Sequence, residues 1–173
     1  MPELPEVETI RRQLAPLVAG RRVVDAWGHP SPKFAPAPLA LDATVGSVER
    51  RGKYLLLALD DDRELVVHLG MTGRLQIRPA TAPPEPHVRA WWQLSASGHG
   101  GQAERLELHD MRRFGRVAVV PRGEHASLPT LAHLGPEPFD PAFTGDHLWR
   151  ALRTSTAQVK TQLLGQRPVA GVG

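Results

Sequence analysis

The chain has 173 residues, 41% of them hydrophobic, and 21 Lys and Arg against 18 Asp and Glu, which allows one cored domain with a smaller second unit and a mildly basic surface. That charge fits a polyanionic partner but is common in proteins without one. Because the chain has no cysteine, disulfides and cysteine-ligated zinc are excluded within it. No apolar run approaches ~18 residues and the N-terminus is acidic, so we expect neither a membrane span nor a signal peptide. A cytoplasmic monomer is the expectation that follows.

Apolar residues recur at helical spacing near the amino end of the chain, at Val7, Ile10, Leu14 and Leu17. This pattern predicts a helix from about Pro5 to Val18, closed by Gly20. The start of such a helix would hold Pro2, Glu3 and Glu6 close together at one end.

Short β-rich runs then alternate with turn residues as far as Val120. The runs are Arg22–Trp27, Val45–Arg50, Tyr54–Leu59, Glu64–Leu69, Arg74–Arg78, Val88–Leu94, Arg105–Leu108 and Arg116–Val120. The acidic triplet 60–62 separates two of them and is typical of a hairpin turn. Eight strands at this spacing predict a mainly β fold, either a β-sandwich or a flattened barrel, with the preceding helix in the same domain, residues 1–120.

A Pro- and Gly-rich segment, residues 121–141, is interpreted as a linker. After it, Thr144 is a candidate N-cap of a helix, and Ser155 or Thr156 could begin another. In that second helix, Val159, Leu163 and Leu164 are expected to face inward. Residues 142–173 would then form the start of a second, helical unit.

The first residues carry unusual chemistry. If Met1 is removed, Pro2 presents a secondary amine that is far less basic than lysine, since an α-amino group titrates near ~8. Amines of this kind attack carbonyl carbons and form Schiff bases. Glu3 beside it could donate a proton to a leaving group or a ring oxygen. The alternative is an ordinary helix start, with Pro5 in the first turn and Glu6 near the positive end of the helix dipole.

Three further groups have both an ordinary and a functional interpretation. Lys53 is either a solvated edge lysine or a pocket cation that would oppose protonation of the Pro2 amine. Met71 lies in a Gly-flanked turn, where a thioether is hard to bury. Arg112 and Phe114 lie in a second Gly-terminated loop, and basic-aromatic clusters of this kind are common at any surface.

Several segments resemble the bacterial formamidopyrimidine-DNA glycosylase family, in the order in which the family has them. They are Met1–Glu8 (MPELPEVE), Arg51–Leu56 (RGKYLL), His68–Met71 (HLGM), His109–Gly115 (HDMRRFG) and His133–Pro138 (HLGPEP). The resemblance covers the whole chain, but it stops before the second half of the family's helix-two-turn-helix unit and before its zinc finger. It therefore implies the N-terminal portion of a base-excision repair enzyme, truncated as a fragment or by an interrupted reading frame.

The resemblance also implies residue roles. Pro2 would be the nucleophile, Glu3 the acid that protonates the opening sugar, and Lys53 a phosphate ligand that assists β-elimination, with Glu6 as a second acid. The implied activity is that of a DNA glycosylase and AP lyase that removes oxidised purines, such as 8-oxoguanine and formamidopyrimidines.

The implied partner is damaged double-stranded DNA, which would place the protein at the nucleoid. An enzyme that extrudes a base must fill the space left behind, and the family does so with residues matching Met71, Arg112 and Phe114. His87 matches a family contact to the DNA backbone, and Arg153 and Lys160 are candidate phosphate ligands. The family's structural zinc belongs to the finger that this sequence lacks, so no metal ligand and no cofactor are expected in this chain.

Two alternatives remain open. The chain could be an inactive fragment that at most binds damaged DNA, since the parts that hold the far side of the duplex are absent. The other alternative is a basic β-sandwich that binds RNA or protein and catalyses no reaction. It would require the resemblance of the N-terminal octet to the family to be a coincidence.

Overall fold

The computed structural model describes residues 2–83, 85–96 and 101–173. Its first element is helix α1 (Leu4–Val18), which confirms the predicted amino-terminal helix to within one residue at its start. Val7, Leu14 and Val18 are buried on one face of α1. Gly20, at a φ of 75°, then turns the chain into the first strand, a conformation that glycine adopts without strain.

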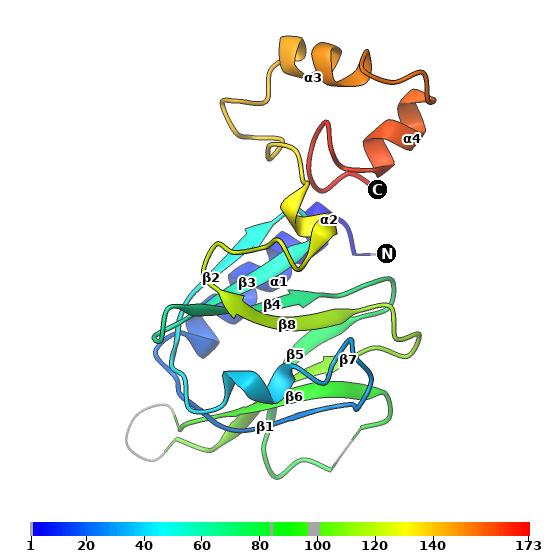
Figure 1. The fold of residues 1–173 in the computed structure, drawn as a ribbon. Helices are drawn as coiled ribbons and strands as arrows, with labels where there is room; N and C mark the ends of the chain where they lie inside the picture. Colours follow the sequence, from blue (N-terminus) through cyan, green and yellow to red (C-terminus); the bar gives the residue numbers. More distant parts are fainter. Residues whose placement is uncertain (1, 84, 97–100) are drawn as a thin grey trace.

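Eight strands form two four-stranded antiparallel sheets that lie face to face (Figure 1). The first sheet has the order β1 (Val23–Gly28), β6 (Val88–Leu94), β7 (Glu104–His109) and β5 (Arg74–Pro79). The second has the order β2 (Val45–Arg51), β3 (Tyr54–Leu59), β4 (Arg63–His68) and β8 (Arg116–Pro121). All eight predicted strands are confirmed, and of the two expected folds the β-sandwich is the one found.

The acidic triplet 60–62 makes the expected hairpin between β3 and β4. Asp60 also accepts a hydrogen bond from the Thr44 backbone N–H at 2.9 Å, which ties this turn to the start of β2. Because the turn fixes the register of the hairpin, Tyr54 lies directly opposite His68.

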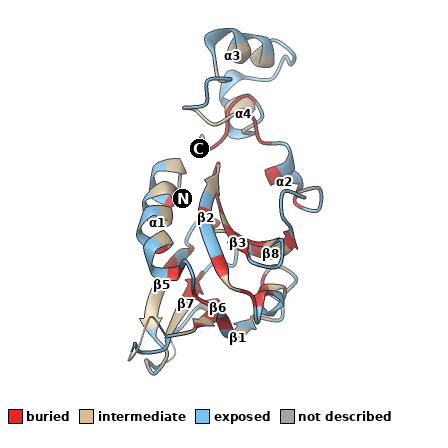
Figure 2. Cartoon of the chain, turned by 90° about the vertical axis from the view of Figure 1, so that its left-hand side faces the viewer, coloured by how far each residue is buried: buried red, intermediate tan, exposed pale blue. Residues whose placement is uncertain are grey.

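The main core fills the space between the two sheets, as the buried positions in Figure 2 show. Trp92 of β6 and Phe34 of the loop after β1 are among its largest fully buried side chains. The short 3-10 helix η1 (Ala37–Ala40) closes one side of this core, and its Ala37 carbonyl accepts a hydrogen bond from the Trp92 indole at 2.9 Å. This bond satisfies the polar atom of a buried tryptophan.

A second, smaller core covers the outer face of the β2-β3-β4-β8 sheet. The segment expected to be a linker contains helix α2 (Pro129–Ala132) and supplies Leu128, Leu131 and Leu134 to this core. Ala170, near the end of the chain, packs into the same cluster. Both faces of this sheet are therefore covered, which explains why β3 and β4 are apolar on both faces rather than alternating.

The remaining helices lie beyond α2, away from the sandwich (Figure 1). Thr144 caps α3 (Gly145–Leu152) as predicted, because its side chain accepts from the His147 backbone N–H. Helix α4 (Val159–Leu164) begins after Gln158, so the predicted start at Ser155 or Thr156 was wrong. Ser155 instead accepts a hydrogen bond from the Ala157 N–H, which holds residues 155–157 in a turn.

The predicted inward packing of α4 was also wrong. Val159 and Leu164 are 53% and 47% exposed, and no residue of α4 is buried. Leu163, the third residue of the predicted inward face, is half-buried. In addition, no helix of the described residues has the length and apolarity needed to cross a membrane.

Candidate active site

The start of α1 and the hairpin between β2 and β3 bring Glu3 and Lys53 together. The Lys53 Nζ lies 2.5 Å from the Glu3 Oε2, and the Lys53 side chain is only 4% exposed. Burial excludes the solvated edge lysine that was one of the two interpretations. Because a buried ammonium is costly without a partner, the ion pair holds Lys53 against the amino end of α1, at the residue that follows Pro2 in the sequence. Pro2 itself does not line the cavity described below.

Glu6 takes part in the cap of α1. Its carboxylate accepts a hydrogen bond from the Glu3 backbone N–H at 2.9 Å, one half of a capping box. The Glu6 residue is exposed and does not line the cavity beside Lys53. The geometry supports the capping role, and a role for Glu6 as a second acid stays a prediction.

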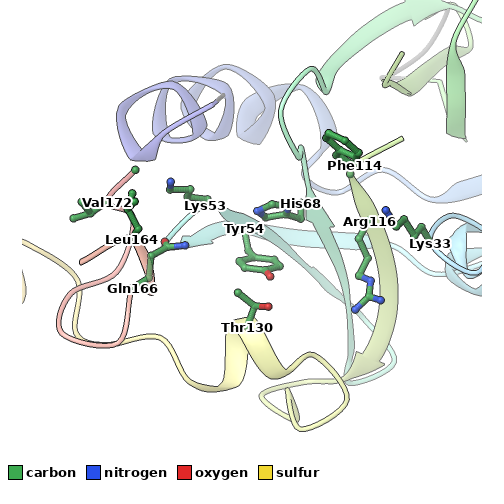
Figure 3. Close-up of a pocket in the computed structure, with 12 residues that line it drawn as sticks. Lys33, Lys53, Tyr54, His68, Phe114, Arg116, Thr130, Leu164, Gln166 and Val172 are labelled. Atoms are coloured by element: carbon green, nitrogen blue, oxygen red, sulfur yellow. The ribbon is translucent and has the colours of Figure 1, made fainter. Parts of the chain in front are cut away.

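A cavity of about 340 Å³ opens beside Lys53 (Figure 3). Its lining comes from the loop after β1, from the β2–β3 turn, from β3, β4 and β8, from α2 and α4, and from the end of the chain. The lining residues are Lys33, Lys53, Tyr54, His68, Phe114, Gly115, Arg116, Thr130, Leu164, Gln166, Val172 and Gly173. Three of them are cations, from different parts of the chain, and among the lining residues none is an Asp or Glu. The cavity therefore favours an anionic or electron-rich ligand.

His68 of β4 lines this cavity beside Tyr54, with their ring centres 4.5 Å apart (Figure 3). Burial, together with the positive charges of Lys53 and Arg116, lowers the pKa of His68 to about 4. The ring is therefore neutral at pH 7, and its Nδ1 accepts from the Gly70 N–H at 3.2 Å. This bond leaves the proton on Nε2, so His68 acts as a hydrogen-bond donor there.

Two turns at the same end of the sandwich bring Met71, Arg112 and Phe114 together. Met71 is 41% exposed and Phe114 46% exposed, and the Arg112 guanidinium lies 4.6 Å from the centre of the Phe114 ring. Phe114 also lines the cavity beside Lys53 (Figure 3). The predicted trio is thus gathered beside the cavity, with its apolar groups exposed to solvent.

The other predicted DNA contacts lie apart from the cavity. His87 is exposed at the start of β6 with a φ of 70°, and its backbone carbonyl accepts from the Asp110 N–H at the base of the Arg112 loop. Arg153 ends α3, with its guanidinium 4.2 Å from the centre of the Trp149 ring. Lys160 is exposed on α4. None of the three lines the cavity.

Sequence reasoning missed Lys33, Arg116 and the place of His68. The Lys33 Nζ donates to the Arg113 carbonyl at 2.9 Å, which draws a Pro-rich loop to the rim of the cavity. Nothing near Lys33 in the sequence signals this long-range contact. His68, by contrast, stood in the quoted HLGM segment, and its apolar neighbours on a central strand already indicated burial.

A charged network fixes the hairpin that carries Lys53. Glu137 accepts from the Gly52 N–H at 2.6 Å and forms an ion pair with Arg50 at 2.7 Å. Arg50 also contacts Glu8 of α1 at 3.2 Å. The hydrogen bond from Arg11, aided by Arg12 and Arg50, lowers the pKa of Glu8 to about 2. Helix α1, the hairpin and the segment after α2 are therefore joined around the site.

No metal centre is evident in the ranges that the structure describes, because no group of three or more His, Cys, Asp or Glu residues is arranged to hold an ion. Fold and site together define a two-sheet β-sandwich module whose site is built at the amino end of its first helix. The buried Lys53, paired with a partly exposed Glu3, and the cationic cavity are its distinguishing features.

Known proteins are similar to this chain in sequence and in fold. The family model described as the formamidopyrimidine-DNA glycosylase N-terminal domain matches residues 1–117. The formamidopyrimidine-DNA glycosylase of Thermus thermophilus is 43% identical over 173 residues, and that of Deinococcus radiodurans is 42% identical over 183. Both alignments cover 100% of this chain, and 60% and 61% of the relatives.

Solved structures of the same family have a similar fold. The crystal structure of the MutM (Fpg) protein from Thermus thermophilus has a TM-score of 0.86 at 43% identity and covers 99% of this chain and 60% of that one. Lactococcus lactis Fpg, bound non-covalently to DNA containing an AP site, has a TM-score of 0.84 at 29% identity and covers 99% and 65%. The chain belongs to the formamidopyrimidine-DNA glycosylase family and spans about 60% of the length of the curated relatives it matches.

Proposed function

We propose that this chain is a base-excision DNA glycosylase with AP lyase activity, acting on oxidised purines in double-stranded DNA. The observation that carries the proposal is the ion pair between the buried Lys53 and Glu3, the residue that directly follows Pro2. Family membership supports the glycosylase class, and the lyase step rests on the chemistry of an N-terminal secondary amine.

In the proposed reaction, Met1 is first removed and the Pro2 nitrogen attacks C1′ of the damaged nucleoside. The base departs with the bonding electrons. The Glu3 carboxylate accepts the proton that the Pro2 nitrogen loses and passes it to the ring oxygen as the sugar opens. The product is an iminium ion between Pro2 and C1′. Lys53 keeps the Pro2 amine unprotonated before attack, because a nearby cation disfavours a second positive charge.

The iminium ion then acidifies the adjacent carbon of the sugar, so that β-elimination breaks the strand on the 3′ side. Lys53 assists this step by holding the phosphate that leaves. Neutral His68 offers its Nε2–H as a further donor to that phosphate within the same cavity. Met71, Arg112 and Phe114 occupy the space from which the damaged nucleotide is extruded.

Borohydride trapping tests the proposal. The 173-residue chain, with Met1 removed, is mixed with a duplex that contains an abasic site and is then reduced at low and at moderate salt. We expect a covalent protein–DNA band, stronger at low salt because phosphate contacts release counterions. Chemical blocking of the N-terminal amine should abolish the band. If a folded chain gives no band at either salt concentration, it is at most a binding fragment and the proposal is wrong.

A further inference from the structure

The Met71 turn and the Arg112–Phe114 loop are packed backbone against backbone. Gly70 precedes Met71 at a φ of 64°, and a Cβ added there would lie 2.5 Å from the Gly115 nitrogen and from the Phe114 carbonyl carbon. No side chain fits at that position. The two loops belong to different connections, β4–β5 and β7–β8, yet they touch at this glycine.

A buried carboxylate lies beneath this contact. Asp110 is 0% exposed, and its Oδ2 accepts from the Gly115 N–H at 2.6 Å. Its Oδ1 accepts from the Arg112 N–H at 3.2 Å and from the Thr72 hydroxyl at 2.7 Å. A buried carboxylate is tolerated only with such partners, so Asp110 requires these three donors and fixes their positions.

The Asp110 backbone is fixed as well. Its N–H donates to the His87 carbonyl at 2.9 Å, and its own carbonyl accepts from the Arg89 Nε at 2.8 Å. The carboxylate is therefore held from the β6 side while it holds the two loops. This arrangement makes Asp110 a fixed point rather than a mobile side chain.

Thr72 provides the link across the loops. Its hydroxyl donates to Asp110 and also lies 3.4 Å from the Arg112 N–H, while its backbone follows Met71 directly. A hydrogen bond to a charged acceptor is stronger than one between neutral groups. Rotation of the Met71 turn would break this bond, so the turn and the Arg112 loop are held in one relative position.

We propose that Thr72 and Asp110 are positioning residues that join Met71, Arg112 and Phe114 into one preformed wedge. The inference rests on the proposed function, because it assumes that these three side chains enter the duplex. They then enter as one unit, and the entropy of ordering two separate loops is not lost on binding. Loss of the Thr72 hydroxyl therefore weakens the action of Arg112 and Phe114 although it touches neither side chain.

Amide hydrogen exchange of the free 173-residue chain tests the coupling without DNA. Thr72→Val keeps the shape but removes the hydroxyl, and Thr72→Ser keeps the hydroxyl. We expect the Arg112 and Gly115 amides to exchange about tenfold faster in Thr72→Val, since a hydrogen bond to a charged group is lost, and near the wild-type rate in Thr72→Ser. The Gly52 amide, bonded to Glu137, serves as the unaffected control. Unchanged exchange at Arg112 and Gly115 in Thr72→Val would overturn the proposal.

The second readout is the fluorescence of a duplex that carries 2-aminopurine opposite an abasic-site analogue. It reports insertion of the wedge into the duplex, which a purely structural role of Thr72 would not affect. We expect the fluorescence change on binding to fall several-fold in Thr72→Val and to be rescued in Thr72→Ser. Met71→Ala should have a smaller effect in the Thr72→Val background than in the wild type. Additive effects would contradict a single unit. Amide exchange decides the coupling even where borohydride trapping fails, so the two proposals fail separately.

Discussion

At the scale of single residues, the burial of Lys53 determines what the site can do. An ammonium that is removed from water keeps its charge only beside a carboxylate, and Glu3 of α1 supplies it. The same pair joins Lys53 to the residue that follows Pro2, whose amine would act as the nucleophile. Stability and chemistry therefore depend on one ion pair.

A double-mutant cycle measures this pair. Glu3→Gln should destabilise the chain by about 1–2 kcal/mol, because it leaves Lys53 buried without a counter-charge while Glu3 itself is partly exposed. In the Lys53→Met background the same change should cost less than about 0.5 kcal/mol. Urea unfolding at pH 7 provides the four free energies. Equal costs in both backgrounds would show that the two side chains do not interact.

The neutral state of His68 predicts a pH dependence of stability. The folded pKa of about 4 lies below the ordinary value of 6.5, so the unfolded chain binds the extra proton first. The free energy of unfolding should therefore fall as the pH is lowered from about 6.5 to about 4, by roughly 2.5 kcal/mol from this residue. His68→Gln removes the titrating group and should flatten that interval. If urea unfolding gives the same slope for both proteins, His68 is not held neutral by the fold.

At the scale of elements, the β2–β3 hairpin is the part whose backbone most constrains the site. Gly52 has a φ of 56°, and a Cβ there would lie 2.8 Å from the Leu134 Cδ1. Glycine is needed at this position both for its conformation and for the close approach of the second core. The conformation of this β2–β3 turn then sets the direction of the Lys53 side chain.

Two alanine substitutions separate the cost of backbone strain from the cost of crowding against Leu134. Gly123 has a φ of 79° but open space around it, so Gly123→Ala should cost about 1 kcal/mol from backbone strain alone. Gly52→Ala should cost about 1–3 kcal/mol more, because strain and overpacking add. Thermal unfolding of the two variants gives the comparison. Equal losses would mean that Leu134 yields freely and that contact with the second core does not fix the hairpin.

The sequence was most informative for these local elements. Short β-rich runs bounded by turn residues located every strand, since both are short-range signals. The start of α4 was misjudged because Ser155 and Thr156 have good capping chemistry but Ser155 serves a turn instead. The contacts of Lys33 and Glu137 were not predicted from the sequence, because they join segments that only the folded sandwich brings together.

At the scale of the whole molecule, two cores hold the site between them. The main core lies inside the sandwich, and the second joins α2 and the region around Ala170 to the outer face of β3 and β4. The cavity beside Lys53 draws residues from both the sandwich and the segments packed on it. Loss of the second core should therefore open the cavity without unfolding the sandwich.

Leu131 and Leu164 provide the matched test of this view. Leu131 is 3% exposed in the second core, so Leu131→Ala should cost about 2–4 kcal/mol. Leu164 is largely exposed, and Leu164→Ala should change stability by less than about 0.5 kcal/mol. Hydrogen exchange should localise the loss in Leu131→Ala to α2 and to residues 166–171. Uniformly faster exchange of the sandwich strands would show that the two cores unfold as one.

The central claim is that Pro2, beside the Glu3–Lys53 pair, is the group that reacts with DNA. Peptide mapping of the borohydride-trapped adduct by mass spectrometry tests it most directly. The account predicts that the reduced sugar is attached to the peptide that begins at Pro2, and that Lys53→Met keeps the attachment there while slowing it. An adduct on the peptide containing Lys53, with a free Pro2 amine, would contradict the account.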